Sequence, residues 1–220
     1  MERYRKGVEA KKWYVDQRLE KTLAALKKNG FQVFSVPTKQ DALEKILELI
    51  PTDVLVGIPG TMTIREIGLI EALVARGNHV AQHWSAQTSE ESLTMMKQEL
   101  NSDVFVTSVN AITYDGKLVD EGQTGNRVAA MVFGPSKVIV VAGFNKIVRD
   151  VEDGIQRIKK VAAPMNAKRM GRKTPCVLTL ECKEVGCKLP ERVCRMTTII
   201  KAKPGSTDFT IILVGETLGF

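Results

Sequence analysis

The segment Val138-Ile139-Val140-Val141-Ala142-Gly143 decides the fold class of this chain. Its first five residues are all apolar and mostly β-branched, with no polar alternation. Such a run is typical of a strand buried on both faces, as in parallel sheets covered by helices. A helix is expected to follow over residues 148–161, and another apolar strand over residues 209–214.

The same alternation of strand and helix extends through the N-terminal half. The expected strands are residues 31–36, 54–58, 79–83 and 103–109, and the expected helices are residues 3–29, 41–50, 64–76 and 89–100. Thr63 is the expected N-cap of the helix at 64–76. Strands that alternate with helices form βαβ units. The sequence therefore predicts an α/β fold with a mostly parallel sheet, helices on both faces, and a ligand site beyond the carboxyl ends of the strands.

Length and charge narrow the class of protein. A chain of 220 residues with 44% hydrophobic composition can form one sizeable core. The net charge of +7 equals the excess of seven Lys and Arg in the acid-free run 157–173, so the remainder is balanced. That run could bind an anionic ligand, dock an acidic partner or form a solvated face. It contains no aromatic residue to stack on bases, so nucleic acid is not the expected partner.

The N-terminus and the hydropathy pattern indicate the compartment. The first six residues carry charges and lead into a polar helical pattern without an apolar signal segment. No apolar run approaches the length of a membrane span. We therefore expect a cytoplasmic protein, in which clustered thiols are more often ligands than disulfides.

All the cysteines of the chain fall in one short stretch, within residues 170–205, which we read as a small lobe inside the domain. They are Cys176, Cys182, Cys187 and Cys194, with the spacing C-x5-C-x4-C-x6-C. Four thiols in one loop-like segment can meet at a point, which predicts an iron–sulfur cluster, or zinc as the alternative. Reduced structural thiols or a redox pair remain open alternatives.

Two strand ends carry candidate ligand-binding residues. The turn after residues 54–58 offers Gly60, Thr61 and Thr63, whose backbone and hydroxyl donors suit an anion. The end of the 138–143 strand offers Asn145 and Lys146, with Lys146 able to neutralise a phosphate or carboxylate. The alternatives are an ordinary turn with a threonine cap and a surface lysine.

The longest polar segment, residues 110–127, follows another buried strand and contains the hairpin signal Asp115-Gly116. Asp120 and Glu121 are candidate catalytic acids, bases or nucleophiles. The candidate ligand-binding residues here are Asn110, Thr124, Gly125, Asn126 and Arg127. A solvated hairpin is the alternative. His79 and His83 are expected on one strand, on the same face but well apart, and are set aside as metal ligands.

Four stretches together resemble the LUD domain family of lactate-utilisation proteins. They are GIPGTMTIREIGLIEAL (57–73), DVFVTSVNAITYDGKLVDEGQTGNRVAAMVFGP (103–135), KVIVVAGFNKIVRDVEDGIQRIKKVAAPMNAKR (137–169) and the terminal ILVGETLGF. The resemblance implies one LUD domain over residues 1–220. It also implies a fold like that of ribose-5-phosphate isomerase A, glucosamine-6-phosphate isomerase and the CoA transferases.

The resemblance also implies site roles and a function. Gly60-Thr61 takes the place of an anion-binding turn, residues 124–126 that of a glycine-rich active-site loop, and Lys146 that of a strand-end lysine. Two departures are visible: Gly122 stands where relatives often have aspartate, and the interval between the two middle cysteines is four residues rather than two.

The family implies an accessory or electron-transfer subunit in the oxidation of L-lactate to pyruvate. Such a subunit would bind a small carboxylate or phosphate ligand and work with iron–sulfur partner subunits. Association of this chain into a homo-oligomer is a further open alternative. The alternatives are a stand-alone enzyme of the sugar-phosphate isomerase or acyl-CoA transferase type, and a non-enzymatic ligand-binding regulator.

Overall fold

A computed structural model describes residues 2–220 of the chain and has a parallel six-stranded sheet at its centre. The strand order is β1-β10-β7-β4-β2-β3, and every neighbouring pair runs parallel. The strands are β1 (Gln32–Val36), β2 (Leu55–Gly57), β3 (His79–Ala81), β4 (Val104–Thr107), β7 (Lys137–Gly143) and β10 (Asp208–Val214). The apolar 138–143 segment lies in β7, near the middle of the sheet, which explains its lack of polar residues.

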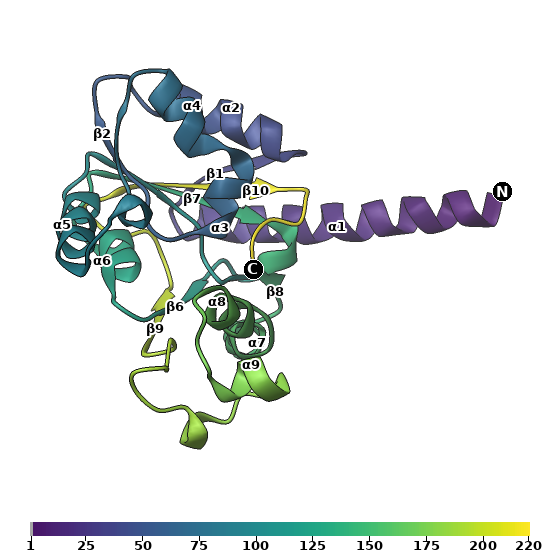
Figure 1. Cartoon of the computed structure of the whole chain (residues 1–220). Coiled ribbons are helices and arrows are strands. Elements are labelled where there is room, and N and C mark those ends of the chain that lie inside the picture. The colour runs from purple at the N-terminus through teal and green to yellow at the C-terminus, as the bar shows by residue number, and fades with distance from the viewer. Residues whose placement is uncertain (1) are drawn as a thin grey trace.

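Helices cover both faces of this sheet, as the sequence predicts (Figure 1). The helices α2 (Lys39–Leu49), α3 (Met62–Ile67) and α4 (Leu69–Ala75) bury one face through residues such as Ile46 and Leu73. On the other face lie α1 (Glu2–Lys28), α6 (Asn126–Val132) and, towards the β2 and β3 edge, α5 (Ser89–Leu100). Alternate residues of β7 point to opposite faces, so Val138 and Val140 join one core cluster while Ile139 and Val141 join the other.

A second, four-stranded sheet, which the sequence does not predict, packs against the α1 side. Its order is β8 (Ile147–Val148), β5 (Ala111–Thr113), β6 (Leu118–Gly122) and β9 (Met196–Ile200). Ile112 and Leu118 face the main core, whereas Ala111 and Val119 pack on Ile158 and the helices that follow it. The predicted Asp115-Gly116 turn joins β5 to β6, and Gly116 has a φ of +78°.

Two expected helices have different bounds. The helix expected at 64–76 begins at Met62 and is broken by Gly68 in the left-handed conformation, so Thr61 takes the N-cap position and Thr63 lies inside the helix. The helix expected at 148–161 begins only at Val151, because Ile147–Val148 form a strand and the Asp150 side chain caps the helix. It comprises α7 (Val151–Arg157), a π-helical turn (Ile158–Ala162) and α8 (Ala163–Arg169).

The two histidines do not share a strand, contrary to expectation. His79 lies in β3, which ends at Ala81, and His83 begins a short 3₁₀ helix that extends to Ser85. The pairing of β3 with β2 stops at Ala81, so the chain leaves the sheet before it reaches His83.

The lobe that carries the cysteines follows α8. It contains the short helix α9 (Pro175–Thr179) and a 3₁₀ turn (Glu184–Gly186), and it returns to the second sheet through β9. In Figure 1 it lies below α7 and α8, away from the main sheet. An ion pair of 2.7 Å between Lys159 and Glu184 ties it to the π-helical turn.

The N-terminal half of α1 extends beyond the rest of the molecule (Figure 1). Its buried residues are Leu19, Thr22 and Leu26, all in the second half, whereas Tyr4 and Trp13 are exposed. Although α1 spans 27 residues, it is strongly charged. None of the helices within residues 2–220 combines the length and apolarity that crossing a membrane would need.

Candidate functional site

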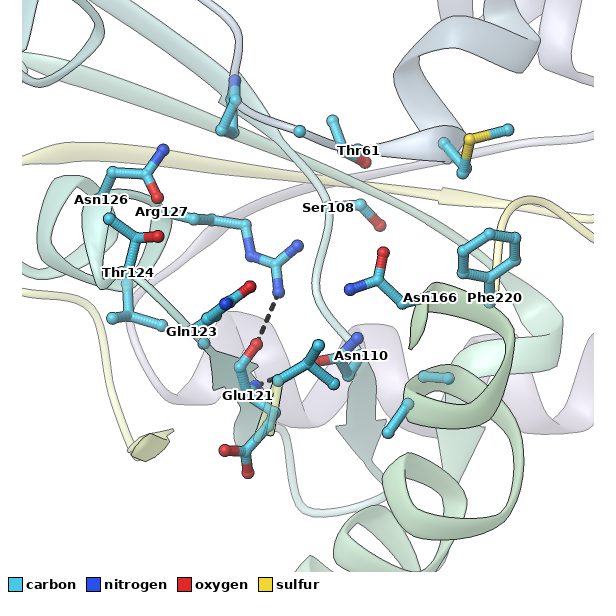
Figure 2. Close-up of a pocket in the computed structure, with 18 of the residues that line it drawn as sticks. Thr61, Ser108, Asn110, Glu121, Gln123, Thr124, Asn126, Arg127, Asn166 and Phe220 are labelled. Carbon is cyan, nitrogen blue, oxygen red and sulfur yellow. Dashed lines mark hydrogen bonds between the residues drawn. The ribbon is translucent and has the colours of Figure 1, made fainter. Parts of the chain in front are cut away.

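The carboxyl ends of the central strands converge on a cavity of about 350 Å³. The segments that follow β2, β4 and β7 each contribute to its wall, and the loop between β6 and α6 closes one side. Figure 2 shows Thr61, Ser108, Arg127 and Asn166 directed towards this space from different elements. This is the edge at which open parallel sheets place their ligands, and it agrees with the sequence prediction.

Lys146 lies at the wall of the cavity and is buried, with 3% of its surface exposed. Its Nζ donates hydrogen bonds to Thr63 Oγ1 at 2.8 Å and to Ser108 Oγ at 2.9 Å. Burial, together with the nearby Arg157 and Arg127 charges, lowers the pKa of Lys146 from 10.5 to about 7. Within residues 2–220 no carboxylate forms an ion pair with this amine, and the nearby Asp120 and Glu66 charges offset only part of the fall in its pKa.

Asp120 lies behind the cavity wall and holds Arg127 in place. Its oxygens accept from Arg127 Nε at 2.7 Å, from Arg127 Nη2 at 3.0 Å and from the Asn110 backbone N–H at 3.0 Å. Burial raises the pKa of Asp120, whereas the Arg127 charge and hydrogen bonds oppose that rise. Because its oxygens are occupied and it does not line the cavity, this geometry suits a positioning residue better than the predicted acid, base or nucleophile.

Glu121 lines the cavity, and its backbone contacts two other wall residues. Its carbonyl accepts from Arg127 Nη2 at 2.9 Å, and its N–H donates to Asn110 Oδ1 at 2.8 Å. Figure 2 shows the carboxylate directed away from the Arg127 guanidinium. It accepts a hydrogen bond of 2.7 Å from Thr197 on β9.

The loop at 122–126 brings three further predicted residues to the cavity: Thr124, Gly125 and Asn126. Gly125 has a φ of +98° where the chain turns into α6, a conformation that favours glycine. Asn126 Nδ2 donates to Glu99 Oε2 at 3.1 Å. Glu99 is buried, with 1% of its surface exposed, although it belongs to a largely exposed helix.

Trp84 lies at the rim of the cavity and contacts two arginines. The guanidinium carbons of Arg65 and Arg169 lie 3.6 Å and 4.3 Å from its ring centroids. A Cβ on Gly60 would lie 2.6 Å from Trp84 Nε1, so the indole requires glycine at this position. Burial and the neighbouring Arg169 lower the pKa of Arg65 to about 10. Arg169 donates only to Asn166 among its hydrogen bonds within residues 2–220, which leaves donors at the cavity rim.

The basic run 157–173 does not form one surface patch. Arg157 is half-buried and donates to the Asn145 and Asn110 carbonyls at 3.0 Å and 2.6 Å. Arg169 stacks on Trp84, and Lys159 pairs with Glu184 in the cysteine lobe. The positive charge of this run is therefore divided between the interior, the cavity rim and the lobe.

Asn145 is the predicted ligand-binding residue that lies outside the cavity wall. Its side chain accepts from Leu218 N–H at 3.1 Å and donates to the Leu218 and Gly219 carbonyls. Glu66 accepts from Gly219 N–H at 2.7 Å. These contacts hold the segment 218–220 against Lys146, and Phe220 lines the cavity (Figure 2).

The four cysteines all line a second cavity, of about 240 Å³, between the lobe, the π-helical turn and β9. None forms a disulfide. Burial raises the pKa of Cys182 and Cys187, and it raises that of Cys194 to about 12. Within residues 2–220 no three His, Cys, Asp or Glu side chains are close enough to hold one metal ion.

The two cavities adjoin each other. Glu121, Ile158, Ala163, Val193 and Cys194 line both of them. The predicted ligand-binding and thiol residues are therefore brought to neighbouring sites, although their roles remain predictions.

Sequence reasoning missed several residues of the first cavity. They are His83, Trp84, Ser108 and Asn166 on the wall, and Glu99 behind it. Ser108 could have been found, since it directly follows a buried strand. Trp84 carries no such signal. Arg169 belongs to the basic run 157–173, but its contact with Trp84 joins segments far apart in the chain.

Comparisons with known proteins identify the family. The LUD domain matches residues 19–214. The crystal structure of a duf162 family protein from Deinococcus radiodurans at 1.70 Å resolution has a TM-score of 0.52 and 13% identity, covering 91% of this chain and 98% of that chain. At such low identity this similarity shows the fold alone. No curated protein matches the sequence. The match over most of the chain confirms the predicted family: the protein belongs to the LUD domain family.

Proposed function

We propose that this LUD domain protein binds a small anion in the first cavity and serves as an accessory or electron-transfer subunit in the oxidation of L-lactate to pyruvate. The observation that carries the binding site is Lys146, a buried amine on the cavity wall without a carboxylate partner in residues 2–220. Burying an ammonium group without a counter-charge is costly. A carboxylate or phosphate ligand would supply that charge and restore the protonated form of Lys146.

Other wall residues favour the same ligand class. Arg127 is held in position by Asp120, and Arg169 donates only to Asn166 among the described residues, which leaves donors at the rim. Thr61, Ser108 and Asn110 add polar groups that can orient a small molecule. A cavity of about 350 Å³ suits a metabolite rather than a macromolecule.

The cysteine-lined cavity supports the electron-transfer part of the proposal. Its donor set, four thiols from Cys176, Cys182, Cys187 and Cys194, is one that iron–sulfur clusters and zinc both accept. All four thiols line this one cavity, but within residues 2–220 no three His, Cys, Asp or Glu side chains are close enough to hold one metal ion, so the choice of a cluster over zinc rests on the proposed electron-transfer role. An iron–sulfur cluster held there would carry single electrons.

The raised pKa values of three of these thiols argue against a reactive redox pair. Thiol reactivity depends on the thiolate, and burial keeps Cys194 protonated, with a pKa of about 12. A bound cation would reverse this, because a coordinating thiol is deprotonated. The expected partners are further subunits of an iron–sulfur complex.

One observation favours a second function, a stand-alone enzyme of the isomerase type. An amine with a pKa of about 7 is partly neutral at physiological pH and can act as a base. Lys146 would then take a proton from a bound sugar phosphate, while Arg127 holds the phosphate. In this alternative the cysteines would be structural.

Metal content and ligand binding test the proposal separately. Protein purified without oxygen should contain iron and acid-labile sulfide, and replacing all four cysteines by serine should remove both. Zinc alone, or no metal, would refute the electron-transfer role. L-lactate or phosphate should raise the melting temperature of the wild type but not of Lys146→Met. A phosphosugar that is converted by the wild type, with no metal present, would instead support the isomerase alternative.

A further inference from the structure

His83 and Glu99 form a buried pair beside the anion site. Glu99 Oε1 accepts from the His83 backbone N–H at 2.8 Å and lies 2.7 Å from His83 Nδ1. Glu99 Oε2 accepts from Asn126 Nδ2 at 3.1 Å. Within residues 2–220 no lysine or arginine forms an ion pair with this carboxylate, although it is almost fully buried. Both oxygens are thus used to position two side chains of the cavity wall, His83 and Asn126.

The contact with Glu99 decides which ring nitrogen of His83 carries the proton. A carboxylate oxygen accepts hydrogen bonds, so Nδ1 must be the donor. In the neutral ring Nε2 is then an acceptor. Nε2 has no hydrogen-bond partner within residues 2–220, yet it is not among the buried polar atoms that lack one. The acceptor therefore remains accessible on a residue that lines the cavity.

The backbone bond from His83 already ties this segment to α5. The second bond, from the ring, adds a fixed orientation and a fixed tautomer. Because His83 lines the cavity, its fixed acceptor suits a ligand that carries one donor of its own. Lys146, Arg127 and Arg169 provide only donors when charged.

We propose that His83 Nε2 accepts a hydrogen bond from a hydroxyl group of the ligand, so that the cavity selects small anions that carry a hydroxyl group. This inference rests on the proposed anion site and assigns its specificity to His83, with Glu99 as the positioning residue. The same anion without the hydroxyl group would leave Nε2 without a partner and would bind about tenfold more weakly, as expected for the loss of one hydrogen bond.

Nitrogen-15 NMR tests the tautomer. The chain contains only two histidines, and the exposed His79 serves as the internal reference, so His79→Gln assigns both sets of signals. The expected result is a neutral His83 ring protonated at Nδ1 in the wild type and a mixture of tautomers in Glu99→Gln. A ring that is protonated at Nε2 or is cationic in the wild type would overturn the proposal, since Nε2 would then donate.

Matched ligand pairs test the selectivity without any variant. L-lactate should bind about tenfold more tightly than propionate, or 2-hydroxypropyl phosphate more tightly than n-propyl phosphate, by calorimetry. The hydroxylated ligand should also shift the His83 Nε2 signal and leave His79 unchanged. Equal affinities within both pairs would overturn the role of His83 and leave the anion site standing. If no member of either pair binds, both the anion site and this inference fail.

Removing the imidazole ring of His83 tests its role in ligand selectivity directly. His83→Phe keeps a planar ring and has no hydrogen-bond acceptor. It should reduce the affinity for the hydroxylated ligand to that for its partner without a hydroxyl group, whereas His79→Phe should change neither. A His83→Phe protein that keeps the tenfold preference would also overturn the proposal. If His83→Phe fails to fold, the ligand pairs and the NMR measurement on the wild type still decide.

Discussion

Replacing Lys146 by methionine should stabilise the protein at low pH and abolish anion binding. Methionine keeps the unbranched shape of the side chain and removes its charge. The fall in the pKa of Lys146 from 10.5 to about 7 corresponds to about 5 kcal/mol, because one pKa unit is about 1.4 kcal/mol. Against this gain, Thr63 and Ser108 each lose a hydrogen bond worth about 1 kcal/mol. The net gain at pH 6 is therefore about 3 kcal/mol.

The stability difference between Lys146→Met and the wild type should depend on pH. Between pH 7 and 10.5 the unfolded chain binds the Lys146 proton more tightly than the folded chain does. The free energy of unfolding of the wild type should therefore rise with pH across this window, relative to the variant. The advantage of Lys146→Met should be largest below pH 7 and should fall to about zero near pH 9.

Urea unfolding of both proteins from pH 6 to pH 9 measures the difference directly. Lys6→Met, which alters an exposed lysine of α1, is the control and should show a flat difference. A Lys146→Met protein that is less stable than the wild type at pH 6, with no pH dependence in the difference, would refute the reasoning. It would mean that the hydrogen bonds of Lys146 outweigh the cost of burying its charge. The same variant should show no melting shift with phosphate.

Two further variants test the framework of the site. Asp120→Ala leaves the Arg127 charge uncompensated, and unfolding in urea should show a loss of about 3–5 kcal/mol. As a control, Asp208→Ala breaks a more exposed pair with Lys137 and should lower the free energy of unfolding by less than about 1 kcal/mol. If the two variants lose the same free energy, the buried Asp120–Arg127 pair is not important for stability. Gly116→Ala should lower the melting temperature, because a Cβ there would lie 2.8 Å from the backbone of α1 at a φ of +78°. An unchanged melting temperature would show that the hairpin can move away from α1.

The strand and helix pattern could be predicted because its signals are local. The buried runs of β7 and β10 could be recognised from their composition alone, and α5 has the expected bounds, residues 89–100. The second sheet could not be predicted in the same way. Its strands β5 and β8 have three and two residues, and they become strands only by pairing with each other and by packing between the main sheet and α7. Their apolar runs are too short to show the hydrophobic periodicity from which a strand can be predicted.

The residues of the site, too, could be predicted only in part. The turns that follow parallel strands must meet at one edge, so Gly60, Asn110 and Lys146 could be placed at a common site from their positions in the sequence. Whether Asp120 faces the ligand or Arg127 depends on the strand pairing of β6, which the sequence does not reveal.

The sequence by itself determined the family, the parallel sheet and the edge at which its turns gather, because these follow from the order and local composition of the elements. Only the tertiary structure decided the chemistry of that edge. It buried Lys146 without an ion-pair partner among residues 2–220, joined His83 to Glu99 across 16 residues, and brought Trp84 into contact with Arg65 and Arg169. A side chain acquires its charge state and its free donors or acceptors from the neighbours that packing supplies, and those neighbours are distant in the chain.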